Sequence, residues 1–174
     1  MIRVHAELCS GCRQCEVACS FAHSSGSVAR SLARIQVVKD EAMGLDYPVL
    51  CQQCTDRFCL AACPTGALSI GSLGEVLVDQ AKCSGCGLCE NACPIGAIRM
   101  HDDNPQVCNL CGGTPQCVQA CTMQALCYEP DNTEHAMLRP ADPGEGHTPD
   151  AKARQYAMRE TDEHRSRWHT QGWR

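Results

Sequence analysis

Apolar residues occur in this chain in short stretches, several of them alternating with polar residues, and segments that contain Gly, Ser or Pro separate them. Such alternation is typical of β-strands, and a glycine-containing turn between two stretches predicts a hairpin at residues 66–79. The predicted strands are residues 2–6, 35–38, 66–70, 75–79, 96–100 and 124–128. Residues 20–30 are rich in Ser, Gly and Ala and predict a loop. Elements this short favour an α+β fold of small hairpins and short helices.

Cysteines recur between these stretches in groups of four. In the group that begins at Cys83 and ends before Pro94, three cysteines are two residues apart and a fourth follows after three more. This is the bacterial spacing for cubane iron–sulfur clusters, in which the first three cysteines bind one cluster and the fourth binds a neighbouring one. Such a motif needs a partner, and the chain has three more groups. In chain order, motifs 1 to 4 are Cys9, Cys12, Cys15 and Cys19; Cys51, Cys54, Cys59 and Cys63; Cys83, Cys86, Cys89 and Cys93; and Cys108, Cys111, Cys117 and Cys121.

The four motifs contain sixteen of the 17 cysteines, the number that four 4Fe–4S clusters require. Zinc is the main rival, but its paired Cys-x2-Cys knuckles leave no place for a third cysteine two residues on. A secreted disulfide scaffold normally has an even cysteine count behind a signal peptide, and here the count is odd and residues 1–8 have no apolar segment. We therefore predict four 4Fe–4S clusters. We expect the remaining Cys127 to be a small buried apolar residue on a strand.

Two pairings of the motifs are open. Motifs 2 and 3 are neighbours joined by the predicted hairpin, so the two-cluster rule pairs them and leaves motif 1 to pair with motif 4. The alternative pairs motif 1 with 2 and motif 3 with 4. The nested version is favoured because motifs 2 and 3 end in proline and motifs 1 and 4 do not. It predicts four ligand sets: site A, Cys9, Cys12, Cys15 and Cys121; site B, Cys19, Cys108, Cys111 and Cys117; site C, Cys51, Cys54, Cys59 and Cys93; and site D, Cys63, Cys83, Cys86 and Cys89.

Charge and the remaining motifs narrow the function classes. The formal net charge is −5 with neutral thiols, and four oxidised clusters at about −2 each lower it to about −13, which disfavours nucleic acid as a partner. The sequence contains neither a Gly-x-Gly-x-x-Gly fingerprint nor a phosphate loop, and no apolar run is long enough to span a membrane. We expect a soluble, cytoplasmic protein. His5, His23, His101, Arg13 and Lys82 are candidates to tune a cluster, but structural or solvated roles are favoured for all five.

The sequence changes character after Tyr128. Residues 129–146 are rich in Pro, Asp and Gly and predict an extended linker. Thr148 and Pro149 then predict a helix start, with a capping hydroxyl followed by proline in the first turn. The apolar stripe of this helix is slight, Ala153, Tyr156 and Ala157 with Trp168 beyond, and we expect too few apolar groups to hold it on the chain's own core. The domain prediction is therefore 1–128 for the cysteine-rich domain and 129–174 for a tail that docks onto another subunit or is disordered.

Residues 1–128 resemble the four-cluster, ferredoxin-like electron-transfer subunits of anaerobic oxidoreductases. Within that family, the stretches 9–20 and 44–54 look most like the iron–sulfur subunit of tungsten-dependent aldehyde oxidoreductases. The resemblance implies the nested pairing and a fold of two ferredoxin-like two-cluster halves. It also implies a non-catalytic relay whose partners are a molybdenum- or tungsten-pterin subunit and a flavin subunit that takes the electrons onward.

Other functions stay open at this point. Related iron–sulfur subunits serve formate-, carbon monoxide- and hydrogenase-linked complexes. A redox sensor or a cluster-delivery protein is a different class, and the sequence contains no DNA-binding or signalling module that a sensor would need. The tail is predicted to bind the catalytic subunit or further copies of this chain.

Overall fold

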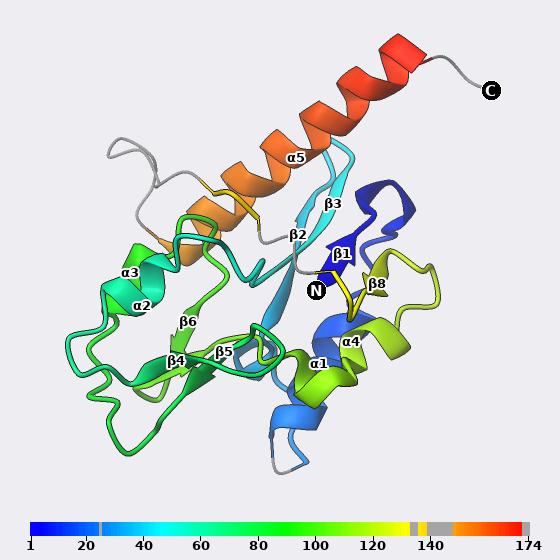
Figure 1. Ribbon diagram of the computed structural model, residues 1–174. Helices are drawn as coiled ribbons and strands as arrows, with labels where there is room; N and C mark the ends of the chain where they lie inside the picture. The colour runs from blue at the N-terminus through cyan, green and yellow to red at the C-terminus, as the bar shows by residue number, and fades with distance from the viewer. Residues whose placement is uncertain (25, 133–135, 139–147, 172–174) are drawn as a thin grey trace.

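The computed structural model describes residues 1–24, 26–132, 136–138 and 148–171, with the side chains of the last helix described as far as residue 162 (Figure 1). The strands are β1 (Ile2–Val4), β2 (Ile35–Asp40), β3 (Leu45–Leu50), β4 (Leu68–Ile70), β5 (Val76–Val78), β6 (Arg99–His101), β7 (Asn104–Gln106) and β8 (Leu126–Tyr128). The α-helices are α1 (Gln14–His23), α2 (Phe58–Ala61), α3 (Leu88–Ala92), α4 (Gln116–Gln119) and α5 (Pro149–Gln171), and three 3-10 turns are η1 (Ala6–Leu8), η2 (Arg30–Leu32) and η3 (Leu110–Gly113). The chain is therefore a small mixed helix and strand protein, as predicted.

All described strands lie in two-stranded antiparallel sheets. The predicted hairpin is confirmed as β4–β5, with Leu68 opposite Val78. Strand β1 pairs with β8, with Ile2 opposite Tyr128, so the first strand of the chain is held against the strand that follows motif 4. Each of the six predicted strands overlaps an observed strand.

Two strands and part of a helix were not predicted. Strand β3 forms the longest hairpin, with β2, and contains Pro48 opposite Val37. Strand β7 follows β6 through Asp102 and Asp103, whose φ values of 46° and 59° are the left-handed conformation of a tight hairpin turn. The loop predicted at residues 20–30 is wrong in its first residues, because α1 continues through them to His23.

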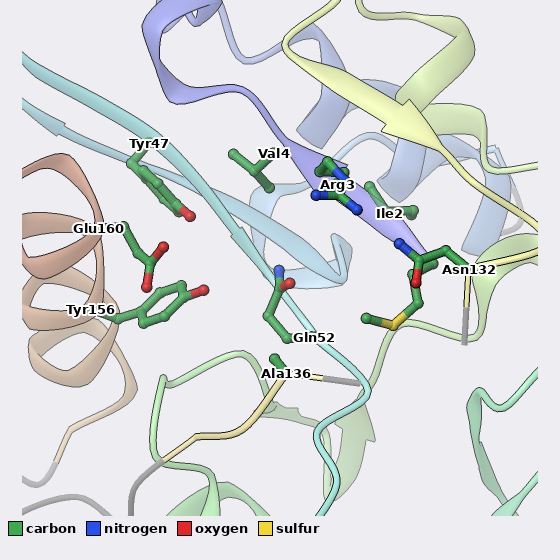
Figure 2. Close-up of a pocket in the computed structure, with 10 residues that line it drawn as sticks. Ile2, Arg3, Val4, Tyr47, Gln52, Asn132, Ala136, Tyr156 and Glu160 are labelled. Atoms are coloured by element: carbon green, nitrogen blue, oxygen red, sulfur yellow. The ribbon is translucent and has the colours of Figure 1, made fainter. Parts of the chain in front are cut away.

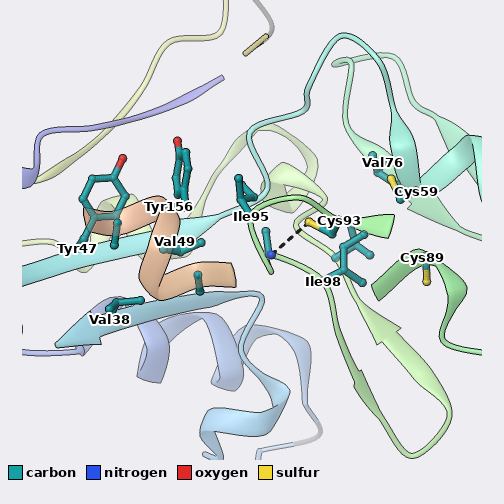
Figure 3. Packing of buried hydrophobic residues seen from close by; sticks show 14 of the residues in the cluster. Val38, Tyr47, Val49, Cys59, Val76, Cys89, Cys93, Ile95, Ile98 and Tyr156 are labelled. Carbon is teal, nitrogen blue, oxygen red and sulfur yellow. Dashed lines mark hydrogen bonds between the residues drawn. The ribbon is translucent and has the colours of Figure 1, made fainter. Parts of the chain in front are cut away.

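The β2–β3 hairpin lies between two groups of elements. Figure 1 shows α1, α4, β1 and β8 on one side and α2, α3 and the β4–β5 hairpin on the other. Alternate residues of β2 face the two groups: Val37 belongs to the apolar cluster around α1 and α4, and Val38 to the cluster around α2 and α3 (Figure 3). Period-two alternation thus lets one hairpin contribute to both cores.

Helix α5 packs against the hairpin, which corrects the expectation that too few apolar groups would hold it. Ala153 and Ala157 are fully buried, and Tyr156 meets Tyr47 edge to face with ring centroids 5.7 Å apart. Small side chains allow this close approach, and so does Gly96, where an added Cβ would lie 2.0 Å from the Pro149 carbonyl oxygen. A few small residues therefore bury a helix that a count of large apolar groups would leave free.

The predicted helix start is confirmed by the hydrogen bond from the Ala151 N–H to the Thr148 hydroxyl oxygen, at 3.3 Å. Polar contacts add to the docking: the Lys152 ammonium donates to the Asn91 carbonyl at 2.6 Å, and Gln36 donates to Asp150 at 2.8 Å. The predicted linker also contacts the rest of the chain, because the Glu129 N–H donates to the Met1 carbonyl at 2.8 Å. Residues 133–135 and 139–146 of that linker and the side chain of Trp168 lie outside the described residues.

Candidate metal centres

The four motifs share one local architecture, which places their cysteines. The first two cysteines of each motif lie in a loop or 3-10 turn, and the third lies in the short helix that follows, as Cys15, Cys59, Cys89 and Cys117 do in α1, α2, α3 and α4. Three of these helices begin after a residue in the left-handed conformation: Arg13 at φ 63°, Arg57 at φ 49° and Gly87 at φ 72°. That residue turns the chain sharply, so that the loop cysteines and the helix cysteine face the same point.

Two of the predicted ligand sets each line one pocket. All four cysteines of site A line the first pocket and all four of site D line the second. In site A the last cysteine of motif 4, Cys121, joins the first three cysteines of motif 1. In site D the last cysteine of motif 2, Cys63, joins the first three of motif 3. Helix packing accounts for both, since α1 contacts α4 and α2 contacts α3.

Sites B and C lie deeper. Burial, with a smaller contribution from the neighbouring Cys19 and Cys111, raises the pKa of Cys108 to about 12. In site C burial likewise raises the pKa of Cys59 to about 12, with Cys93 and Cys54 as the charged neighbours. Because iron binds thiolates, these buried thiols must release their protons on binding metal.

The residues present fit 4Fe–4S clusters. A cubane takes one thiolate on each of its four irons, so its ligands surround a volume and need not converge on a point. Among the described residues no group of three or more His, Cys, Asp or Glu side chains is placed to hold a single metal ion. Backbone N–H groups already point at ligand sulfurs, from Arg34 to Cys19 at 3.2 Å and from Ala97 to Cys93 at 3.3 Å. Such hydrogen bonds stabilise the negative charge of a cluster.

Most of the other residues that were candidates to tune a cluster lie beside a carboxylate close to them in the sequence. His5 lies 3.4 Å from Glu7, His101 lies 3.5 Å from Asp102 and Lys82 lies 3.3 Å from Asp79, which are local ion-pair contacts near the surface. Arg13 is the left-handed residue before α1, and it also lines the pocket that contains the four cysteines of site A.

His23 lies within site B. Its Nδ1 is 2.8 Å from the Cys19 carbonyl oxygen and its Nε2 is 3.1 Å from Asn109 Oδ1. Each ring nitrogen is also 3.9 Å from a ligand sulfur, Nδ1 from Cys19 and Nε2 from Cys111. These sulfur contacts raise the pKa of His23 to about 10. The structural role favoured from the sequence therefore does not account for all the contacts of His23, because two of them are to sulfurs of predicted cluster ligands.

Cys127 lies on β8 outside the four sets, as predicted, but it is half-buried rather than buried. Its thiol contacts the Gln124 carbonyl oxygen at 3.8 Å.

The sequence did not predict the burial of two polar residues that lie beside ligand cysteines. Glu16, 2% exposed, accepts hydrogen bonds from the Val37 N–H at 2.6 Å and from Arg30 at 2.9 Å. Gln53, also 2% exposed, donates to the Cys108 carbonyl at 3.0 Å and accepts from the Val76 N–H at 3.1 Å. The available signal was their position directly beside ligand cysteines, in motifs 1 and 2.

A pocket of a different kind lies between α5, β1 and β3 (Figure 2). It has a volume of about 290 Å³, and its described lining includes Arg3, Tyr47, Tyr156 and Glu160 but no cysteine. It therefore contributes no ligand to the metal centres. Among the described residues no helix is both long and apolar enough to cross a membrane.

Two models of 4Fe-4S binding domains match the chain, one over residues 6–22 and the other over residues 76–99, which contain motifs 1 and 3. The polyferredoxin-like subunit of an aliphatic sulfonate oxidoreductase from Pyrococcus furiosus is 42% identical over 123 residues, covering 69% of this chain and 70% of that protein. The chain belongs to the 4Fe–4S ferredoxin-like family. This ferredoxin-like protein is also 35% identical over 148 residues to the putative electron transport protein YsaA of Escherichia coli, covering 77% of this chain and 92% of that one.

A third relative is the electron transport protein HydN of Escherichia coli, 34% identical over 147 residues, which cover 70% of this chain and 82% of HydN. The matched domains, the 17 cysteines and these relatives agree that the ferredoxin-like protein binds multiple 4Fe–4S clusters.

Proposed function

We propose that the chain is an electron-transfer subunit with four 4Fe–4S clusters at sites A to D, relaying electrons between a catalytic oxidoreductase subunit and a downstream acceptor. The observation that carries the proposal is that all four cysteines of site A line one pocket and all four of site D line another. Three contacts support the further proposal that the four sets adjoin one another in a row. Helix α1 supplies Cys15 to site A and Cys19 to site B, one turn apart. Cys51 of site C is half-buried and Cys108 of site B is buried, and the two are near enough to interact electrostatically. Cys59 of site C and Cys63 of site D are again four residues apart, in and just after α2.

The protein's own residues make such a row suited to relay rather than catalysis. Each cluster supplies reversible one-electron transfer. Four cysteines at each site occupy all four irons and leave none for a substrate. The apolar residues around Cys108 and Cys93 exclude water, and the backbone N–H groups of Arg34 and Ala97 stabilise charge on the sulfurs.

The proposed domain division follows from the row. Residues 1–128 form two ferredoxin-like two-cluster halves, one with sites A and B and the other with sites C and D, and all sixteen ligands lie in this part. Residues 129–174 form the docking tail. Because the first turns of α5 pack against β3, a surface for another subunit or a further copy of this chain would lie on the outer face of α5.

The partner we favour is a tungsten- or molybdenum-pterin subunit, with tungsten-dependent aldehyde oxidation as its activity and a flavin subunit as the onward acceptor. Support comes from the connecting residues 9–20 and 44–54 and from a relative named as a subunit of an oxidoreductase. A formate-, carbon monoxide- or hydrogenase-linked complex is the alternative within the same class. A redox sensor or cluster-delivery protein is less well supported, because the four sites tie together segments that are far apart in the sequence.

Anaerobic purification of the full chain from its natural source, together with whatever remains bound, tests this function. The complex is expected to contain tungsten or molybdenum and to reduce a dye when an aldehyde is added, and its mass by light scattering reports the subunits present. The matched preparation is the complex with the Cys127→Ser substitution, which leaves all four sites intact. Recovery of the chain with neither a catalytic subunit nor any dye reduction by aldehyde, formate, carbon monoxide or hydrogen would overturn the proposal.

A further inference from the structure

An enclosed cation lies beside site B. The Arg34 side chain is partly buried, and its Nε is enclosed without a hydrogen-bond partner among the described residues. The charge of Arg34 acts on Cys19, Cys108 and Cys111, three of the four cysteines of site B. A guanidinium is permanently charged, and an enclosed one needs an anion nearby. A cluster with four thiolates at site B supplies that anion.

Several basic side chains near the other sites are paired with a carboxylate. Near site A, Arg30 pairs with Glu16 at 2.9 Å and Lys39 pairs with Asp46 at 3.4 Å. Near site D, Lys82 pairs with Asp79 at 3.3 Å. A carboxylate beside a cation cancels most of its effect on a third charge, and Arg34 has no carboxylate among its described ion pairs. Arg13, which lines the pocket of site A, and Arg57, before α2, also lack one. Arg34 differs from both in its enclosed Nε, which has no hydrogen-bond partner among the described residues.

His23 adds a hydrogen-bond donor at the same place. Each of its ring nitrogens faces a ligand sulfur at 3.9 Å, Cys19 on one side and Cys111 on the other, so either tautomer presents an N–H toward the site. Asn109 fixes the ring through Nε2 at 3.1 Å and also accepts from the Cys111 N–H at 3.2 Å. The ring is thus held between motifs 1 and 4.

We propose that Arg34 and His23 raise the reduction potential of the cluster at site B, so that the first electron to enter the chain comes to rest there. Adding an electron makes a cluster more negative, and a nearby positive charge or sulfur hydrogen bond stabilises that form. Site B lies inside the row, between sites A and C, so it holds an electron away from solvent and within reach of both ends. The inference rests on the proposed four-cluster assignment.

An anaerobic potentiometric titration of the full chain, followed by electron paramagnetic resonance, tests it. Dithionite supplies one electron to site B and is itself oxidised to the sulfite level, and the cluster gains neither a bond nor a proton. The site B signal is the one that Cys111→Ser alters. In Arg34→Gln the ratio of oxidised to reduced cluster at site B should rise at least about tenfold at a fixed potential, which equals about 59 mV for a one-electron couple.

Matched variants separate charge from structure. Arg34→Lys keeps the charge and should keep most of the potential, and Arg154→Gln removes an equal charge on α5, where Arg154 bonds to Asp40. His23→Phe should lower the potential by a smaller amount, and His23→Gln, which retains a donor, should restore part of it. Unchanged site B potentials in Arg34→Gln and His23→Phe with full iron content would overturn this inference alone. A parent protein with fewer than four clusters would instead overturn the proposed function.

Discussion

Removing the iron is expected to abolish the cooperative thermal unfolding of this protein. The sites tie together segments far apart in sequence, such as Cys9 with Cys121 and Cys19 with Cys108, and aromatic residues make up only 4% of the chain. The apolar clusters themselves include ligand cysteines, so loss of a cluster leaves a void where the core should be closed. Metal binding then contributes much of the free energy of folding.

Circular dichroism melts of the holoprotein and of chelated, reduced apoprotein measure this effect. The holoprotein should unfold in one steep transition and the apoprotein should show none. Cys127→Ser is the matched control, because it removes a thiol outside the four sites and should melt like the parent. An apoprotein with its own cooperative transition would contradict the expectation and would show that the apolar clusters suffice for folding.

Breaking the row at its middle is expected to abolish electron transfer while the catalytic partner keeps its own activity. Cys51→Ser removes a ligand of site C at the point where sites B and C adjoin. The variant should lose about a quarter of its iron, since one of four clusters is affected. Reduction of an acceptor at the far end of the row should fall to background, and a small dye that collects electrons at the catalytic subunit should still be reduced.

The same comparison with Cys127→Ser controls for the loss of a cysteine. Retention of about three quarters of the iron shows that the variant has folded, so a loss of transfer can be attributed to the missing cluster. Full transfer to the distant acceptor in folded Cys51→Ser would show that electrons bypass site C and that the row is not the path.

The spacing of the cysteines predicts the ligand sets because the constraint is local. Two-residue gaps followed by a turn into a short helix bring three sulfurs together independently of the rest of the chain. The fourth cysteine, three residues further on, is expected to bind the neighbouring cluster. The strands after motifs 2 and 4 were equally visible, since Leu68 and Leu126 begin short apolar stretches directly beyond the cysteines.

What sequence reasoning missed depends on tertiary context. Strand β3 contains Pro48, which usually argues against a paired strand, and β7 is the polar Asn-Pro-Gln. Burial of Gln53 is visible only when motifs 2 and 4 and β5 have come together around it. The docking of α5 depends on Gly96 and two alanines, whose contribution is the room they leave rather than the area they bury.

Iron and acid-labile sulfide analysis of anaerobically purified protein tests the central claim most directly. Four cubanes predict about sixteen iron atoms and about sixteen sulfides per chain. A chain with about twelve of each would remove one site from the row, and a chain with zinc in place of iron and no sulfide would contradict the account altogether.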